Sequence, residues 1–133
     1  LSEIFEAPVT MLVPPWNRIE ERVIKQLPAL GYRTLSAFAQ KPTHDNMPPG
    51  LTRLNTHSDP IAWRGDRGFA GDAAALTPLV AHLTHQRMGG VPSEPAGLLT
   101  HHLDHDPGIW QFTRMLVALI HDHPGARWVA GHS

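Results

Sequence analysis

The sequence has no cysteine, a single tyrosine and no excess of either charge. Without cysteine the chain cannot form disulfides, use a thiol nucleophile or bind a metal through thiolate, which leaves histidine, aspartate and glutamate as possible metal ligands. The 11 basic and 12 acidic residues give a formal net charge of -1, which provides no reason to expect nucleic acid or an anionic membrane surface as a partner. We therefore expect a neutral polar or small-molecule partner.

Long apolar runs and several well-known motifs are also missing. No stretch approaches the roughly 20 apolar residues that span a bilayer, and residues 1–30 lack the pattern of a signal peptide, so the location stays open with the cytoplasm favoured. The sequence has no glycine-rich phosphate loop, no Gly-x-Ser-x-Gly elbow and no His-Glu-x-x-His helix. Nucleotide binding, serine hydrolysis of that type and zincin proteolysis therefore have no support.

What the sequence does contain is an alternation of apolar patterns at strand and helix spacing. Strands are predicted over residues 9–13, 35–38, 51–56, 97–100 and 126–130. Helices are predicted over residues 2–6, 19–30, 72–89 and 106–123. This alternation predicts an α/β fold with a mostly parallel sheet, and residues 1–133 are treated as one unit. Because the chain begins at Leu1 and not at methionine, we expect a piece of a longer protein.

The predicted helix ends depend on a few capping residues. Asn17 is the expected N-cap of the helix over residues 19–30, and Asp106 with Pro107 opens the last helix. The helix before it begins either at Asp72 or at Thr77, and the second start keeps a proline out of the helix interior. Its inner face is expected to contain the following residues: Leu76, Leu79, Val80 and Leu83.

Three apolar runs end in polar or aromatic side chains, at residues 10–17, 51–59 and 97–106. In a parallel sheet the ligand crevice lies at the carboxyl ends of the strands, so these endings predict a functional edge. His101 and His102 follow one strand and point to opposite faces, so a single histidine is expected to face the crevice and to act as an acid or base near neutral pH.

Each remaining feature also has a plain structural interpretation. Asp106 is expected to cap a helix, with Asp104 and His105 as solvated loop residues, although these residues also resemble a metal cluster. His82 and His85 lie one turn apart on what we expect to be a solvated helix edge. A simple turn accounts for Asp59 followed by proline, and another for the two prolines before Trp16, which also suit a groove wall for sugar rings.

Taken in order, the three endings resemble the carboxyl-terminal half of the polysaccharide deacetylase family, also called the NodB homology domain or carbohydrate esterase family 4. The turn of residues 14–17 resembles its third motif, residues 55–63 resemble the fourth, and the run Leu-Leu-Thr-His that ends at His101 resembles the fifth. The resemblance extends over nearly all of the chain. It implies part of a distorted (β/α) barrel and a hydrolase that uses a divalent metal, usually zinc, to remove N-acetyl or O-acetyl groups from sugars.

The same resemblance implies roles for individual residues. His101 and Asp59 would be catalytic, with His101 protonating the departing amine after metal-activated water has attacked the acetamide carbonyl. Seven further residues would shape the substrate site: Pro14, Pro15, Trp16, Asn17, His57, Trp63 and Leu99. No metal ligand is assigned within this chain.

Two departures from the family pattern are visible. Val13 occupies the place of the arginine that orients the catalytic base in the family, and the first and second motifs, which contain the aspartate base and the metal ligands, do not occur here. The expected partners are therefore an acetylated sugar and the missing amino-terminal half of the domain, and we expect this chain alone to be inactive. Two alternatives are a non-catalytic carbohydrate-binding or pseudoenzyme domain, and a histidine-based metal-binding module.

Overall fold

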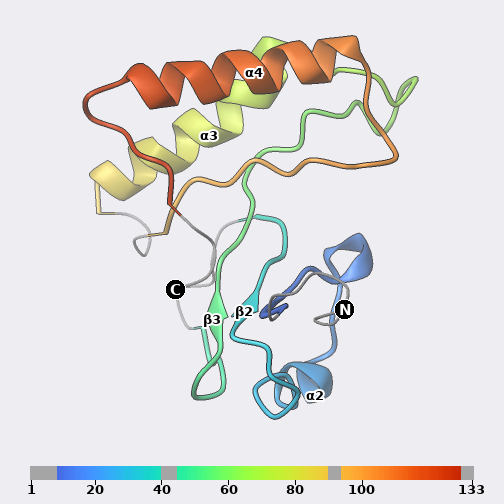
Figure 1. Cartoon of the computed structure of the whole chain (residues 1–133), viewed down its shortest axis with the longest axis vertical. Helices are drawn as coiled ribbons and strands as arrows, with labels where there is room; N and C mark the ends of the chain where they lie inside the picture. Colours follow the sequence, from blue (N-terminus) through green and yellow to red (C-terminus); the bar gives the residue numbers. More distant parts are fainter. Residues whose placement is uncertain (1–8, 40–44, 90–93, 130–133) are drawn as a thin grey trace.

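The computed structural model describes residues 9–39, 45–89 and 94–129. Its strands are β1 (Met11–Leu12), β2 (Thr34–Leu35) and β3 (Thr52–Arg53), which pair in that order and are all parallel (Figure 1). The helices are α2 (Glu21–Ile24), α3 (Asp72–Arg87) and α4 (Pro107–Asp122), with a short 3-10 turn η1 (Pro15–Asn17). The predicted α/β class with parallel strands is confirmed. The helix predicted over residues 2–6 lies outside the described residues.

The strands are shorter than the apolar runs that predict them. Beyond β2 and β3 the two segments stay together, because Thr56 N–H donates to the Ala37 carbonyl at 2.8 Å and a single bridge joins Phe38 to Thr56. Between these contacts the Asn55 side-chain oxygen accepts the Ala37 N–H at 3.1 Å, in place of a backbone carbonyl. This side chain interrupts the regular ladder.

The two later strands are not formed as predicted. Within residues 97–100 the pairing is one parallel bridge between Leu98 and Ser58. Residues 126–129 contain no strand, and residue 130 lies outside the described residues. The sheet of the described residues is therefore small, with three members.

The predicted helix over residues 19–30 is regular only from Glu21 to Ile24 and continues as turns. Its N-cap is Glu20, so the prediction that Asn17 caps it is wrong. The reason lies in η1, where Trp16 (φ 57°) and Asn17 (φ 55°) are both left-handed and turn the chain before the helix begins.

The two long helices begin near their predicted starts. Asp106 caps α4, because its Oδ1 accepts the Ile109 N–H at 2.8 Å and Pro107 occupies the first helical position. Helix α3 takes the earlier of the two predicted starts and contains Pro78 in its interior. The Thr77 hydroxyl donates to the Ala73 carbonyl at 2.7 Å near this proline.

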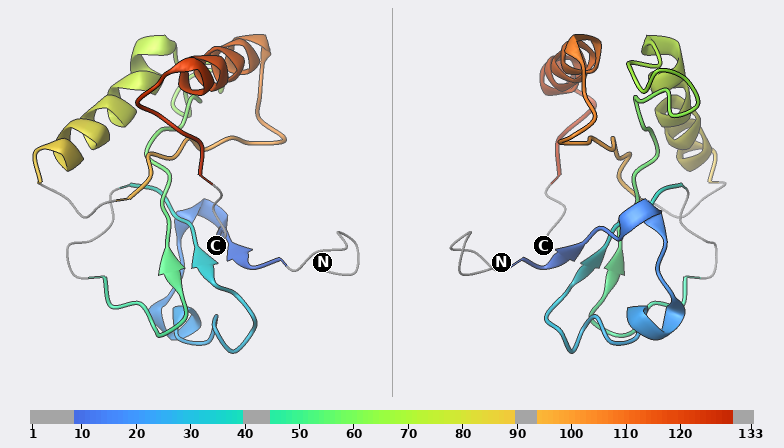
Figure 2. Two further views of the ribbon diagram at one scale, coloured as in Figure 1. Left: turned by 60° about the vertical axis from the view of Figure 1, so that its left-hand side comes forward. Right: turned by 90° about the vertical axis from the view of Figure 1, so that its right-hand side faces the viewer.

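The two ends of the molecule have separate apolar clusters. Helices α3 and α4 lie side by side at one end, and the sheet with α2 lies at the other (Figures 1 and 2). The sheet cluster contains Leu27, Leu35 and Leu51. The helix cluster contains Ala75, Leu79, Phe112 and Leu116. No helix in the described ranges is long and apolar enough to cross a membrane.

The inner face of α3 agrees with the prediction in part, because Leu79 is buried and Leu76 packs against the helix cluster. Val80 and Leu83 are exposed, whereas Ala75, Leu79 and His82 are buried, as helical spacing requires for one face. The small side chain of Ala75 allows close approach of the chain at Ser58, whose hydroxyl donates to the Ala75 carbonyl at 2.6 Å. The helix is therefore rotated about its axis so that a serine hydrogen bond is buried and two large apolar side chains face solvent.

Replacing Phe112 by alanine tests the helix cluster. Phe112 is 2% exposed and packs beside Phe69, with ring centroids 5.4 Å apart, so the substitution leaves a cavity and we expect a loss of about 3–5 kcal/mol in unfolding free energy. Met115→Ala on the same helix is the control, because Met115 is half exposed and the change should be within about 0.5 kcal/mol. Urea unfolding measures both, and equal losses would contradict the described packing.

Candidate functional site

Asp59 and His101 meet in the structure although 42 residues separate them in sequence. The Asp59 Oδ2 lies 3.1 Å from the His101 Nε2, and the same oxygen accepts the Trp63 indole N–H at 2.7 Å. The Trp63 ring meets the His101 ring edge to face, with centroids 5.0 Å apart. Three residues that the sequence singles out are thus brought together by one carboxylate oxygen.

The other Asp59 oxygen makes the turn that the sequence predicts. Oδ1 accepts the Ile61 N–H at 3.1 Å, which is the usual bond of an aspartate that begins a turn. Because this bond uses Oδ1, the carboxylate is held in one orientation with Oδ2 towards Trp63 and His101. The structural role of Asp59 and its place in the candidate site are therefore compatible.

Arg67 also contacts the Trp63 indole. Its guanidinium carbon lies 5.0 Å from the Trp63 ring centroid, a cation-π distance, and its Nη2 is 3.1 Å from the Asp104 carboxylate. Asp104 was expected as a solvated loop residue, but it is paired. Sequence reasoning missed Arg67, whose only local signal is its place in the glycine-rich loop of residues 65–71.

The residues expected to form a groove wall do not contact this group in the described part of the chain. Pro14, Pro15, Trp16 and Asn17 form the η1 turn, and no hydrogen bond or ring contact joins this turn to Asp59 within the described residues. Trp16 is 86% exposed with a left-handed backbone, an uncommon conformation for a bulky residue. Leu99 is half-buried, and its N–H donates to the Ser58 carbonyl at 2.8 Å.

A cavity in the described part of the chain adjoins none of these residues. It has a volume of about 250 Å³ and lies beside α2. The residues that line it are Glu21, Ile24, Lys25, Asp45, Asn46, Met47 and Arg53.

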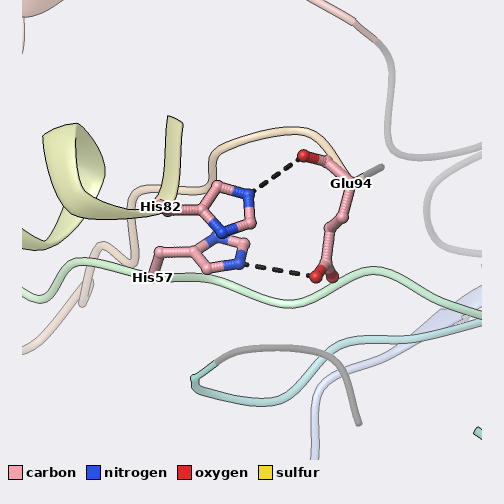
Figure 3. Close-up of side chains that lie close together, drawn as sticks. All are labelled: His57, His82 and Glu94. Carbon is pink, nitrogen blue, oxygen red and sulfur yellow. Dashed lines mark hydrogen bonds and ion pairs between the residues drawn. The ribbon is translucent and has the colours of Figure 1, made fainter. Parts of the chain in front are cut away.

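His57 was expected to contact substrate, but the structure buries it. Its ring stacks on that of His82 with centroids 3.6 Å apart (Figure 3). Its Nδ1 accepts the Gly97 N–H at 3.1 Å. Its Nε2 lies 3.5 Å from Glu94 Oε2. With 5% of the residue exposed, His57 cannot touch a sugar in this conformation. His57 lies in the same segment as Asp59, two residues earlier, with its side chain buried.

The prediction of a solvated edge at His82 is wrong. His82 follows Ala75 and Leu79 by one and two helical turns on the buried face of α3, and its Nε2 lies 3.0 Å from the Glu94 carbonyl oxygen. His85, one turn further, is exposed. Sequence reasoning also missed Glu94, which lies in a proline-containing loop with no periodic pattern to mark it as buried.

Burial controls the charge of His57. Removal from water lowers the pKa of the His57 imidazole, the adjacent His82 lowers it further, and Glu94 acts in the opposite direction. The neutral ring agrees with the geometry, because Nδ1 needs a lone pair to accept the Gly97 N–H. Asp106 is shifted for a different reason: the N–H groups of Ile109 and Phe69 hold the pKa of its carboxyl below the usual value.

Potential metal ligands gather at one place in the described residues, and it is not the Asp59 group. His57, His82 and Glu94 offer ligand atoms that lie within 4.8 Å of one another. Asp59 and His101 have no third such ligand among the described residues. The pair therefore does not by itself fit the metal that the family resemblance implies.

Comparison with protein-family models, with curated proteins and with solved structures found no match for this chain.

Acid should destabilise the protein through His57. Because the folded state has a lowered pKa, the unfolded chain binds more protons below the ordinary value of 6.5, so stability is complete above that pH and falls as the pH decreases towards the folded-state pKa. One group contributes at most about 1.4 kcal/mol per pH unit. Urea unfolding from pH 7.5 to 5.5, with a chelator present, should show a shallower slope for His57→Gln than for the parent. Identical slopes would contradict this role.

Gly97 should tolerate no side chain. A Cβ there would lie 2.6 Å from the Asn55 carbonyl oxygen and 2.9 Å from the Thr56 Cα, both backbone atoms, so Gly97→Ala must push the two segments apart. We expect a loss of about 1–3 kcal/mol by urea unfolding. Gly65→Ala is the matched control, because its nearest contact, the Ala62 carbonyl oxygen, is at an ordinary 3.6 Å. If Gly97→Ala left the unfolding free energy unchanged, the close approach of Gly97 to the backbone of Asn55 and Thr56 would be contradicted.

Proposed function

We propose that this chain is the carboxyl-terminal part of a metal-dependent hydrolase that removes acetyl groups from acetylated sugars. The observation that supports the proposal is the hydrogen bond between Asp59 and His101. The family resemblance assigns both residues to the reaction on the basis of separate motifs, and the fold brings their side chains within 3.1 Å. In this proposal the three parallel strands belong to a distorted (β/α) barrel that the rest of the protein completes.

His101 is the proton donor in the proposed reaction. Asp59 occupies its Nε2, so the proton that leaves comes from Nδ1, and Asp59 stabilises the positive ring before the transfer. The bond between the acyl carbon and the nitrogen breaks as the amine nitrogen takes this proton, while water supplies the oxygen of the released acetate. Asp59 acts through His101 and is therefore a positioning residue.

Trp63 holds the carboxylate and offers an apolar surface. Its N–H bond to Asp59 Oδ2 directs the carboxylate towards His101, and its ring is partly exposed beside that histidine. A sugar ring can stack on such an indole, which agrees with the substrate role that the resemblance implies. Trp16 and Leu99 are proposed to line the remainder of the site.

The metal of the proposed enzyme, usually zinc in the family, requires ligands that this group does not contain. When bound, such a metal supplies an activated water at neutral pH. The residues around Asp59 and His101 do not fit it, because they offer no three-ligand set among the described residues. Its ligands are therefore proposed to lie in the amino-terminal half of the domain.

The experiment measures acetate release from N-acetylglucosamine oligomers by the complete protein that contains this chain. We expect His101→Ala to lower kcat by about 10²–10⁴-fold without loss of bound metal, because a general acid contributes an effect of that size. His102→Ala is the control, since its exposed side chain is next in sequence and lacks the Asp59 bond. Asp59→Asn should lower kcat with little change in KM.

The outcomes separate the candidates. Equal turnover of His101→Ala and the parent would overturn the proposed role of His101. A parent that binds the oligomers but releases no acetate would instead support the non-catalytic carbohydrate-binding alternative.

A further inference from the structure

A second group of functional side chains lies apart from the Asp59–His101 contact. His57 follows β3, His82 lies in α3 and Glu94 precedes the segment that contains Gly97, so three separate parts of the chain supply the group (Figure 3). All three residues are buried, and their ligand atoms lie within 4.8 Å of one another. We define these three side chains as the His-His-Glu cluster.

Two ring nitrogens of the His-His-Glu cluster have no hydrogen-bond partner. These are His57 Nε2 and His82 Nδ1, and both are inaccessible to solvent. Buried polar atoms in proteins are nearly always paired, so two such atoms in one cluster indicate that a partner is absent. Glu94 Oε2 lies 3.5 Å from His57 Nε2, which is too long for a good hydrogen bond.

The charge of the cluster points to a cation. Glu94 Oε1 accepts the Asn55 N–H at 2.7 Å, and in the described part of the chain its carboxylate has no lysine or arginine partner. Burying a carboxylate is unfavourable unless it is hydrogen-bonded and a positive charge compensates it. Two imidazoles and a carboxylate are also a common ligand set for zinc, which leaves a fourth position open.

We infer that the His-His-Glu cluster is a binding site for one divalent transition-metal ion of the zinc class. This ion is distinct from the metal of the proposed hydrolase, whose ligands belong to motifs that do not occur in this sequence. The inference rests on the cluster alone, so it does not depend on acetyl hydrolysis or on the Asp59–His101 pair.

The hydrogen bonds leave one ring nitrogen of each histidine available for an ion. His82 directs Nε2 to the Glu94 carbonyl, so the proton lies on Nε2 and Nδ1 keeps its lone pair. A second ring nitrogen that donates to a carbonyl is the usual arrangement of a metal-binding histidine. Glu94 contributes Oε2, and His57 contributes Nε2.

Binding at His57 changes the link to Gly97. When Nε2 takes the metal, the ring proton moves to Nδ1, which then no longer accepts the Gly97 N–H. The two rings, now stacked with an angle of 30° between their planes, must also tilt so that both lone pairs point to one ion. Metal binding is therefore coupled to the contact that holds residues 97–101.

The test is a titration of the full chain with Zn²⁺ alone, followed by calorimetry, with Co²⁺ absorption as a report on nitrogen and oxygen ligation. We expect one ion per chain. His82→Gln and Glu94→Gln should each weaken binding by at least about 100-fold, since even residues that only orient a ligand contribute 10–100-fold. The control is the double variant His102→Ala with His105→Ala, two exposed histidines outside the cluster, which should bind like the parent.

A second measurement does not depend on whether the variants fold. In the parent, Zn²⁺ should shift the amide signal of Gly97 and the ring signals of His57 and His82 in NMR spectra at one equivalent. Absence of stoichiometric binding would overturn the inference. Binding that leaves these signals unchanged, or that only the double control variant loses, would place the ion on the exposed loop and would also overturn it. Acetate release is not a readout here, so failure of the proposed function leaves these results unaffected.

Discussion

The backbone pairing between residues 57–58 and 97–99 holds the molecule together. The Gly97 carbonyl accepts N–H bonds from both His57 and Ser58, at 2.7 and 3.2 Å, and the Ser58 carbonyl accepts the Leu99 N–H at 2.8 Å. Ser58 also binds α3 through its hydroxyl. This short pairing connects the sheet with the two long helices, which otherwise have separate apolar clusters. It requires glycine at position 97, because a Cβ would meet backbone.

The same pairing sets the geometry of the candidate active site. Asp59 comes one residue after the paired segment on one side, and His101 comes two residues after it on the other. The pairing of residues 57–58 with 97–99 therefore brings Asp59 and His101 within hydrogen-bond distance. The Trp63 N–H, which donates to the same Asp59 oxygen, also holds the carboxylate in place. The buried ring of His57 contacts the same pairing, because its Nδ1 accepts the Gly97 N–H.

Local signals in the sequence identified several features correctly. The cap at Asp106, the proline after it and the apolar spacing beyond predict α4 closely, because each acts within one or two helical turns. Asp59, Trp63 and His101 were singled out from motif order, and the structure brings them together. Their chemical roles stay predictions. The early start of α3 was one of two predicted starts, and the choice depended on whether Pro78 is tolerated inside the helix.

Burial of polar groups is where sequence reasoning failed. The sequence predicts a solvated His82, and no periodic pattern surrounds Glu94, yet both residues are buried. His82 lies on the same face of α3 as Ala75, whose carbonyl accepts the Ser58 hydroxyl. By itself the sequence determined the two long helices, the cap at Asp106 and the residues that end the apolar runs, since these depend on neighbours close in the chain. Only the tertiary structure decided that His57, His82 and Glu94 meet and that Arg67 joins Trp63, because such contacts depend on the rotation of a helix and the path of loops, which no local pattern encodes.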